Sequence, residues 1–341
     1  MSSKKIAIIG GGPAGLGAAS VLSQHGHAIT VYDREQQTGG HLTDWAWLFP
    51  GFASAKDVAG AMVGELDSKN VNIKAGCSVT NLNQSSDNQF QLTLNDGEWS
   101  EQVDAVVYAG GFNVFDATKK EELGYGIYPR VVTSVDLEKI LRGDKPFPFA
   151  ADGRALRIGV VHCVGSRDEK SGNRHCSRMC CVTGVKQSIE LKKHFPDSQI
   201  TAFYMDMRMF GNGFEELYLE AQRDWQILFV RGRVSEVGES ANGLLQVKAE
   251  DTLLGRPLRG EFDLLVLLVG MEPAVPAWLK SQVSLECIES GFLKPQGAFT
   301  KANQSAVNGL FLAGSCKGPS SVVEAWNDGR ACAHDVLRYI K

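Results

Sequence analysis

The sequence predicts an α/β protein with two doubly wound domains, each organised around a parallel sheet. Two observations support this prediction: apolar strand segments alternate with helical segments from residue 5 onward, and the same order of strands occurs again from residue 157. A length of 341 residues suits two domains. The 43% hydrophobic and 22% charged residues match ordinary globular proteins and exclude a disordered chain.

The first strand and helix are joined by a glycine-rich turn. Residues 5–9 predict a buried parallel strand, residues 16–25 a helix, and residues 28–32 a second strand that ends at Asp33. The turn has the spacing G-x-G-x-x-G, formed by Gly10, Gly12 and Gly15. Such a turn holds a pyrophosphate at the start of the helix, and the acid binds a ribose hydroxyl. We therefore expect dinucleotide binding here rather than a purely structural glycine turn.

Further residues resemble the FAD domain of two-domain flavoproteins of the disulfide-reductase type. Residues 38–41 add a second glycine pair, and residues 104–111 stand where that family has a strand ending in A-T-G-G. Residues 309–314 resemble the closing motif, but Ser315 replaces its Asp, a departure at the residue that contacts the ribityl chain. The resemblance implies one FAD bound by Gly10, Gly12, Pro13, Ala14, Gly15, Asp33, Arg34, Gly39, Gly40, His41, Ala109, Gly110, Gly111, Gly314 and Ser315.

The middle of the chain repeats this strand pattern at residues 157–162, 199–204 and 263–270. We therefore expect a second Rossmann-like domain at residues 113–273, inserted into an FAD-binding domain made of residues 1–112 and 274–341. The interval between the first two strands is 18 residues longer in the insert. A cysteine-containing loop, residues 163–181, fills this excess where a second glycine-rich turn would lie. We expect no nicotinamide nucleotide in that turn.

Four of the eight cysteines lie in this loop with the spacing C-x12-C-x3-C-C: Cys163, Cys176, Cys180 and Cys181. Four thiolates can close an all-cysteine metal site. The adjacent pair requires a loop or a helix N-terminus, and residues 182–195 predict a helix that would favour an anionic group. The pattern favours an iron-sulfur cluster; zinc, a redox-active dithiol and buried structural cysteines are the alternatives. We expect His162 and His175 to neighbour the ligands, and Cys77, Cys287, Cys316 and Cys332 to be small buried residues.

Residues 163–169, 175–181 and 203–208 strongly resemble the A-subunit family of heterodisulfide reductases, and the resemblance covers nearly the whole chain. It implies FAD together with a 4Fe-4S cluster on Cys163, Cys176, Cys180 and Cys181. The ferredoxin-type cysteine insertions of methanogen members are absent. The compact form is similar to the corresponding protein of heterodisulfide-reductase-like complexes of sulfur oxidisers. That likeness implies an electron-transferring oxidoreductase in cytoplasmic sulfur-compound oxidation, acting as a homodimer with sister subunits and an electron donor or acceptor protein.

Other function classes are disfavoured. The net charge is −4 and no basic cluster stands out, so we expect no nucleic-acid partner. The N-terminal apolar run is too short for a signal or a membrane span, which predicts a cytoplasmic protein without membrane insertion. No acid-base or nucleophilic catalytic set is visible. The alternative functions are an NAD(P)H-dependent flavin disulfide reductase and a zinc-stapled FAD-binding scaffold.

Overall fold

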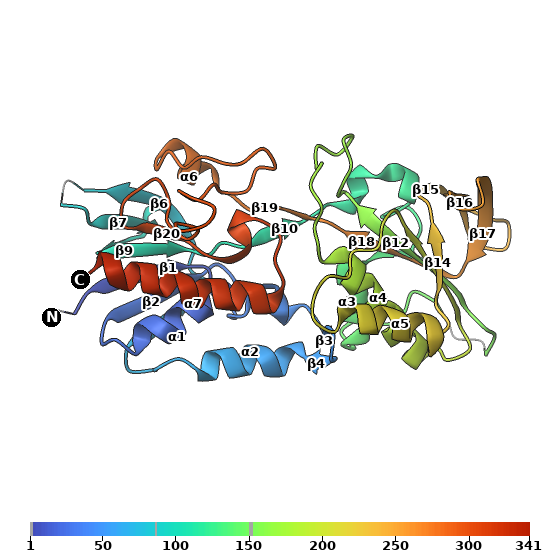
Figure 1. Cartoon of the computed structure of the whole chain (residues 1–341), viewed down its shortest axis with the longest axis horizontal. Helices are drawn as coiled ribbons and strands as arrows, with labels where there is room; N and C mark the ends of the chain where they lie inside the picture. The colour runs from blue at the N-terminus through green and yellow to red at the C-terminus, as the bar shows by residue number, and fades with distance from the viewer. Residues whose placement is uncertain (1–2, 86, 150–152) are drawn as a thin grey trace. The chain divides into compact units, whose positions relative to one another are not determined.

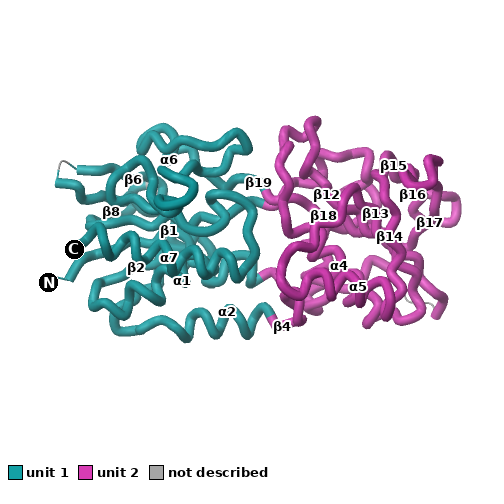
Figure 2. The backbone as a smooth tube through the Cα atoms, in the orientation of Figure 1, with its two compact units in different colours: residues 1–43, 55–113, 272–341 teal, residues 44–54, 114–271 magenta. Residues whose placement is uncertain are grey.

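The computed structural model describes residues 3–85, 87–149 and 153–341 and shows two compact units (Figures 1 and 2). The first unit consists of residues 1–43, 55–113 and 272–341, and the second of residues 44–54 and 114–271. The short segment 44–54 therefore lies in the second unit, although the sequence analysis placed it in the first. β10 (Phe112–Val114) and β19 (Met271–Pro273) pair at the boundaries of the units.

The first unit contains a five-stranded sheet with the order β20-β9-β1-β2-β5, and its recorded strand pairs are all parallel. Its strands are β1 (Lys5–Ile9), β2 (Ala28–Asp33), β5 (Val71–Ala75), β9 (Ala105–Tyr108) and β20 (Leu310–Leu312). An antiparallel sheet joins β6 (Val79–Gln84), β7 (Phe90–Leu94) and β8 (Trp99–Val103). The helical segments are α1 (Pro13–Ser23), η1 (Gly40–Thr43), α2 (Ala55–Gly64), η2 (Asn95–Gly97), α6 (Ala277–Ser281), η5 (Gly314–Lys317) and α7 (Val322–Tyr339).

The second unit repeats this strand arrangement, with the order β11-β18-β12-β13-β14 in parallel pairs. Its parallel strands are β11 (Val131–Thr133), β12 (Arg157–Val164), β13 (Gln199–Tyr204), β14 (Leu228–Arg231) and β18 (Leu264–Val269). Two antiparallel sheets join β15 (Val234–Glu239), β16 (Leu245–Asp251) and β17 (Arg256–Phe262), and β3 (Trp47–Leu48) and β4 (Ala53–Ser54). The helical segments are η3 (Ala117–Lys119), η4 (Glu121–Leu123), α3 (Ser134–Leu141), α4 (Cys180–His194) and α5 (Phe214–Arg223). The predicted pair of doubly wound α/β units is confirmed.

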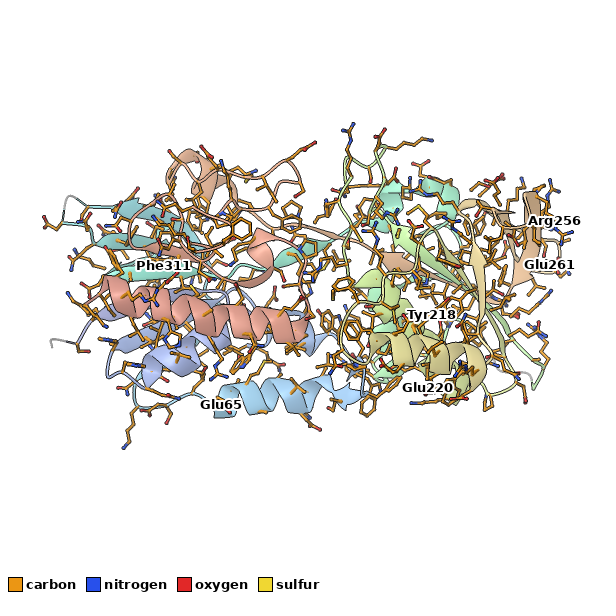
Figure 3. All side chains as sticks on the ribbon, in the orientation of Figure 1. Glu65, Tyr218, Glu220, Arg256, Glu261 and Phe311 are labelled. Atoms are coloured by element: carbon orange, nitrogen blue, oxygen red, sulfur yellow. The ribbon has the colours of Figure 1, made fainter. Side chains whose placement is uncertain are left out.

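Aromatic contacts join the helices to the sheets in each unit. In the first, Phe311 of β20, which is labelled in Figure 3, meets Tyr339 of α7 edge to face, with 5.8 Å between ring centroids. In the second, Tyr218 of α5, also labelled in Figure 3, meets Phe229 of β14 in the same way, with 4.8 Å between ring centroids. Such pairs add to the apolar area that both layers already bury. Within the residues described, no helix is both long and apolar enough to cross a membrane.

A buried ion network holds segment 44–54 in the second unit. Lys186 of α4 is 2% exposed and binds the carboxylates of Glu138 and Glu190. Its Nζ also donates to the carbonyl oxygen of Trp47 at 3.0 Å, and Glu138 accepts the backbone N–H of Ala46 at 3.0 Å. Buried charges persist only where partners satisfy them. The network therefore fixes the β3–β4 segment against α3 and α4.

The close contact of α1 with α7 gives a stability prediction. A Cβ added at Gly329 of α7 would lie 1.9 Å from the carbonyl oxygen of Ala14, so Gly329→Ala should force the helices apart and cost about 1–3 kcal/mol or more. Gly60→Ala in α2 is the matched control, because its Cβ would meet nothing within 4 Å. Alanine there should stabilise the protein by about 0.5–1 kcal/mol through helix propensity. Equilibrium urea unfolding measures both; equal stabilities would contradict the helix contact.

Candidate cofactor sites

The turn from β1 to α1 contains two kinds of glycine: two that close backbone contacts require, and one that borders open space. A Cβ at Gly10 (φ +108°) would lie 2.3 Å from the carbonyl oxygen of Ala109, and one at Gly15 would lie 1.9 Å from that of Gly10. These two positions are glycine because backbone approaches backbone. A Cβ at Gly12 has only the Cα of Gly40 within 4 Å, at 3.8 Å. The protein itself does not require glycine there, which is what a site for a phosphate-bearing ligand predicts.

Asp33 fixes the far side of this turn. It is 5% exposed, and its carboxylate accepts the backbone N–H groups of Gly11 and Glu35, each at 3.0 Å. Burial raises the pKa of Asp33, while the two N–H donors favour its charged form. The Gly39 N–H donates to the Gly11 carbonyl at 2.8 Å, which brings the second glycine pair against the turn. Arg34 points outward and pairs with Glu35 at 3.3 Å.

The remaining predicted residues line the carboxyl ends of β9 and β20 or lie near them. His41 stacks on Phe112 with 4.2 Å between centroids, and its Nε2 lies 3.0 Å from the Phe112 carbonyl oxygen. Gly111 has φ +69° and open space where a Cβ would lie. Gly314, the first residue of η5, packs against the start of α1, because a Cβ there would approach that of Ala14 to 2.5 Å. Pro13, Ala14, Ala109 and Gly110 are therefore gathered with these residues around one turn.

Asp328 of α7 also lies at this site, although it is not among the site residues predicted from the sequence. Its Oδ2 accepts the Gly314 N–H at 2.6 Å, and its Oδ1 accepts Lys317 Nζ at 2.9 Å and Asn303 Nδ2 at 3.1 Å. Ser315 instead shares a hydrogen bond with Ser320 at 2.7 Å. A carboxylate therefore stands beside the turn from a different element. Its only sequence signal is an Asp-Gly pair inside a helical segment, where both residues have low helix propensity.

In the second unit, the corresponding turn is the cysteine loop. Cys163 lies near the end of β12, and α4 begins at Cys180, as the adjacent cysteines required. Cys163, Arg167 and Arg178 all have positive φ, a conformation that non-glycine residues adopt at a cost. A Cβ at Gly165 (φ +69°) would lie 2.1 Å from the ring of Phe115. The loop thus packs tightly where the first unit has an open glycine turn.

Three of the four cysteines come together. The Sγ atoms of Cys163 and Cys180 are 3.9 Å apart, and Cys181 is 2% exposed beside them in the first turn of α4. Cys176 is half-buried and accepts the Arg178 N–H at 3.3 Å. Within residues 3–85, 87–149 and 153–341, no group of three or more histidine, cysteine or acidic side chains is arranged to hold a metal ion. Among the described residues, the structure therefore brings Cys163 and Cys180 into contact without forming a metal-binding arrangement.

The pKa values of Cys163, Cys180 and Cys181 shift in different directions. Cys180 lies between two acceptors, so its hydrogen bonds to Cys163 and Cys181, together with burial, raise its pKa. The same hydrogen bonds lower the pKa values of Cys163 and Cys181 against the effect of burial. Nearby His162 also lowers the pKa of Cys181, and the N-terminus of α4 favours a negatively charged sulfur as well. The site is thus built to stabilise thiolates, the form that binds metals.

Three buried nitrogen atoms at this site lack hydrogen-bond partners. Nη1 of Arg167 and both ring nitrogens of His162 are buried and unpartnered among the described residues. Unsatisfied buried donors are costly, and they mark places where a bound group completes the network. The residues present therefore fit an anionic group with sulfur ligands.

The other cysteines differ in burial. Cys316 and Cys332 are fully buried, and burial raises the pKa of both thiols, as expected of small core residues. Cys77 and Cys287 are only half-buried. The prediction of burial is thus correct for two of these four residues.

The chain has the two-domain α/β fold that is found in thioredoxin reductases. The Lactococcus lactis thioredoxin reductase superposes with a TM-score of 0.70 at 18% identity, covering 99% of both chains. The T. acidophilum thioredoxin reductase gives a TM-score of 0.71 at 17% identity, covering 98% of this chain and 99% of the other. Residues 8–56 also match the family described as NAD(P)-binding Rossmann-like domain. At these identities the structural likeness concerns the fold alone.

The chain is a relative of the heterodisulfide reductase A-subunits, which confirms the resemblance seen in the sequence. It is 38% identical over 240 residues to an iron-sulfur A-subunit of the CoB–CoM heterodisulfide reductase of Methanopyrus kandleri, which is 68% of this chain and 37% of that relative. It is 36% identical over 234 residues to the A-subunit of the H2:CoB-CoM heterodisulfide,ferredoxin reductase of Methanothermobacter marburgensis, covering 66% and 35%. The chain thus matches little more than a third of these relatives' length.

The packing of the cysteine loop generates a binding prediction. Because Cys163 and the Gly165–Phe115 contact occupy the turn after β12, we expect NADH to show no saturable binding in this turn up to millimolar concentration. Isothermal titration of the purified protein with NADH measures this. Micromolar NADH affinity that disappears in Gly165→Ala, with the metal content unchanged, would contradict the interpretation of this loop.

Proposed function

We propose that the protein is an electron-transferring oxidoreductase that holds FAD in its first unit and a 4Fe-4S cluster in its second, as one member of a larger complex. The observation that carries the proposal is the replacement of the second nucleotide turn by a loop that gathers Cys163, Cys180 and Cys181 next to unpartnered donors. Kinship with proteins named as iron-sulfur subunits of heterodisulfide reductase supports the cluster. FAD exchanges two electrons and iron-sulfur clusters exchange one, so the pair converts between these modes of transfer.

The residues of the first unit suit the two ends of an ADP moiety. The N–H groups at the start of α1 face the open space at Gly12, where a pyrophosphate would be stabilised by the helix dipole. Asp33, held by the Gly11 and Glu35 N–H groups, would accept a ribose hydroxyl. Asp328 fixes Gly314 at the same turn and would hold the backbone that borders the ribityl chain.

In the second unit, Cys163, Cys176, Cys180 and Cys181 are the proposed cluster ligands. Cys180 and Cys181 lie in the first turn of α4, which orients their two sulfur atoms. The helix dipole stabilises the negative charge of these sulfurs. Burial of Cys163, Cys180 and Cys181 excludes water from these ligands. A tetrahedral zinc site is the second candidate, because about 2.3 Å Zn–S bonds place sulfurs about 3.8 Å apart. The observed 3.9 Å between Cys163 and Cys180 fits that edge.

The partner subunits are proposed by analogy with the relatives, whereas the process and the dimer are proposed from the resemblance to the compact proteins of sulfur oxidisers. Their names describe subunits of heterodisulfide reductases, and several of those names include ferredoxin. We propose that this chain works with sister subunits of a heterodisulfide-reductase-like complex, as a homodimer, in cytoplasmic oxidation of sulfur compounds. Visible spectroscopy with flavin, iron and zinc analysis of anaerobically purified protein tests the cofactor assignment. One flavin and four irons per chain are expected; stoichiometric zinc without iron would refute the cluster.

Gly12→Val tests the flavin site. Because a Cβ at Gly12 meets no close protein atom, valine should fit the fold and fill the pyrophosphate space. We expect a soluble protein with less than a tenth of the flavin of the unmodified protein and little change in stability. Flavin absorbance per chain and circular dichroism measure these. Gly60→Ala, also at a position with open space, should keep its flavin. Full flavin content in Gly12→Val would show that the site assignment is wrong.

Single Cys→Ser replacements test the ligand set. Loss of any of Cys163, Cys176, Cys180 or Cys181 should remove most of the iron, because each thiolate is one of four bonds to the cluster. Cys77→Ser and Cys287→Ser are the controls and should keep full iron. Iron quantitation with electron paramagnetic resonance of the reduced protein measures all six variants. A cluster that survives loss of Cys181 would disprove the assignment.

A further inference from the structure

Arg167 lies three residues beyond β12 and has a divided guanidinium group. Its Nη2 donates to Oδ2 of Asp206 at 2.7 Å. Its Nη1 is buried and has no partner among the described residues. An arginine fork normally satisfies both terminal nitrogens, as in a bidentate carboxylate pair. Here one half is anchored and the other half is left available for a bound acceptor.

The backbone around Arg167 holds the guanidinium in place. The Arg167 N–H donates to the His175 carbonyl at 2.9 Å, and its own carbonyl accepts Arg233 Nη2 at 2.8 Å. Asp206 is also shared with Arg231, whose Nη2 lies 3.4 Å from Oδ1. Arg167 keeps φ +54°, a conformation that an exposed arginine would not retain without such constraints. The side chain is therefore preorganised rather than free.

Arg167 also lies close to two of the proposed ligands. Its backbone N–H binds the carbonyl of His175, the residue before Cys176. Its partner Asp206 has its backbone carbonyl oxygen 3.7 Å from the Sγ of Cys181. The unpartnered Nη1 thus belongs to a fixed cation beside the sulfurs. Asp206 neutralises only part of the local positive charge, because it serves two arginines.

We propose that Arg167 is a positioning residue that donates a hydrogen bond from Nη1 to a cluster sulfur and thereby raises the reduction potential of the cluster. The inference rests on the proposed function, since it requires a cluster on these cysteines. Each electron gained adds one negative charge to the site, so a nearby fixed cation in a water-poor environment favours the reduced state. Hydrogen bonds to the sulfurs act in the same direction.

The test uses the whole chain, purified anaerobically, and the variants Arg167→Gln and Arg167→Lys. Arg174→Gln is the matched control, because Arg174 lies in the same loop but is exposed and pairs only loosely with exposed Glu169 at 3.6 Å. Potentiometric titration followed by electron paramagnetic resonance gives the midpoint potential, and iron analysis gives the cluster content. We expect a more negative potential in Arg167→Gln, a smaller negative shift in Arg167→Lys, and no shift in Arg174→Gln.

The outcomes separate the two proposals. An unchanged potential in iron-replete Arg167→Gln would overturn the role of Arg167 and leave the cluster standing. If Arg167→Gln holds no iron, Arg167→Lys decides, because one ammonium cannot both pair with Asp206 and reach the sulfur as the fork does. An unchanged potential in that variant overturns the proposal, and a more negative one supports it. Iron missing from the unmodified protein would refute the cluster, and the role of Arg167 with it.

Discussion

Both units depend on how the chain leaves the central strand of a parallel sheet. The central strand has a neighbour on each side, so the backbone must turn sharply at its carboxyl end before it continues as a helix. After β1 the turn relies on Gly10 and Gly15, where carbonyl oxygens leave no room for a side chain. At the end of β12, Cys163 has a left-handed conformation, and a longer loop precedes α4. One topology thus presents backbone in the first unit and sulfur in the second.

The two turns also handle charge differently. In the first, Asp33 is buried but takes two backbone N–H donors, and the open space at Gly12 leaves room for an outside anion. In the second, the negative charge belongs to the protein itself, on the cysteine thiolates. Arg167, His162 and the amino end of α4 surround that charge, and three of the polar atoms of Arg167 and His162 find no partner among the described residues. The cysteine loop therefore holds buried polar atoms whose hydrogen-bonding capacity the described residues leave unused.

The strands and the glycine turn could be predicted because their signals are local. Residues 5–9 and 199–204 are apolar runs of strand length, and the structure places β1 and β13 there. The Cys180-Cys181 pair similarly required a loop or a helix start, and α4 begins at Cys180. Asp328 and Lys186 could not be predicted, because their roles come from contacts with Gly314 and Trp47 that are distant in sequence. Segment 44–54 was misplaced for the same reason, since nothing within it signals the buried lysine that binds it.

The segmented course of the chain has a consequence for biosynthesis. Segment 44–54 emerges from the ribosome long before α4. The carbonyl oxygen of Trp47 therefore has no hydrogen bond from Lys186 until α4 has been made. The apolar side of α1 likewise lacks its close contact with α7 until about 300 further residues have been made. Because neither unit is a continuous stretch, nascent chains expose unpaired surfaces during most of their synthesis. We therefore expect chaperones to bind this chain during translation, until the late segments of each unit have been made.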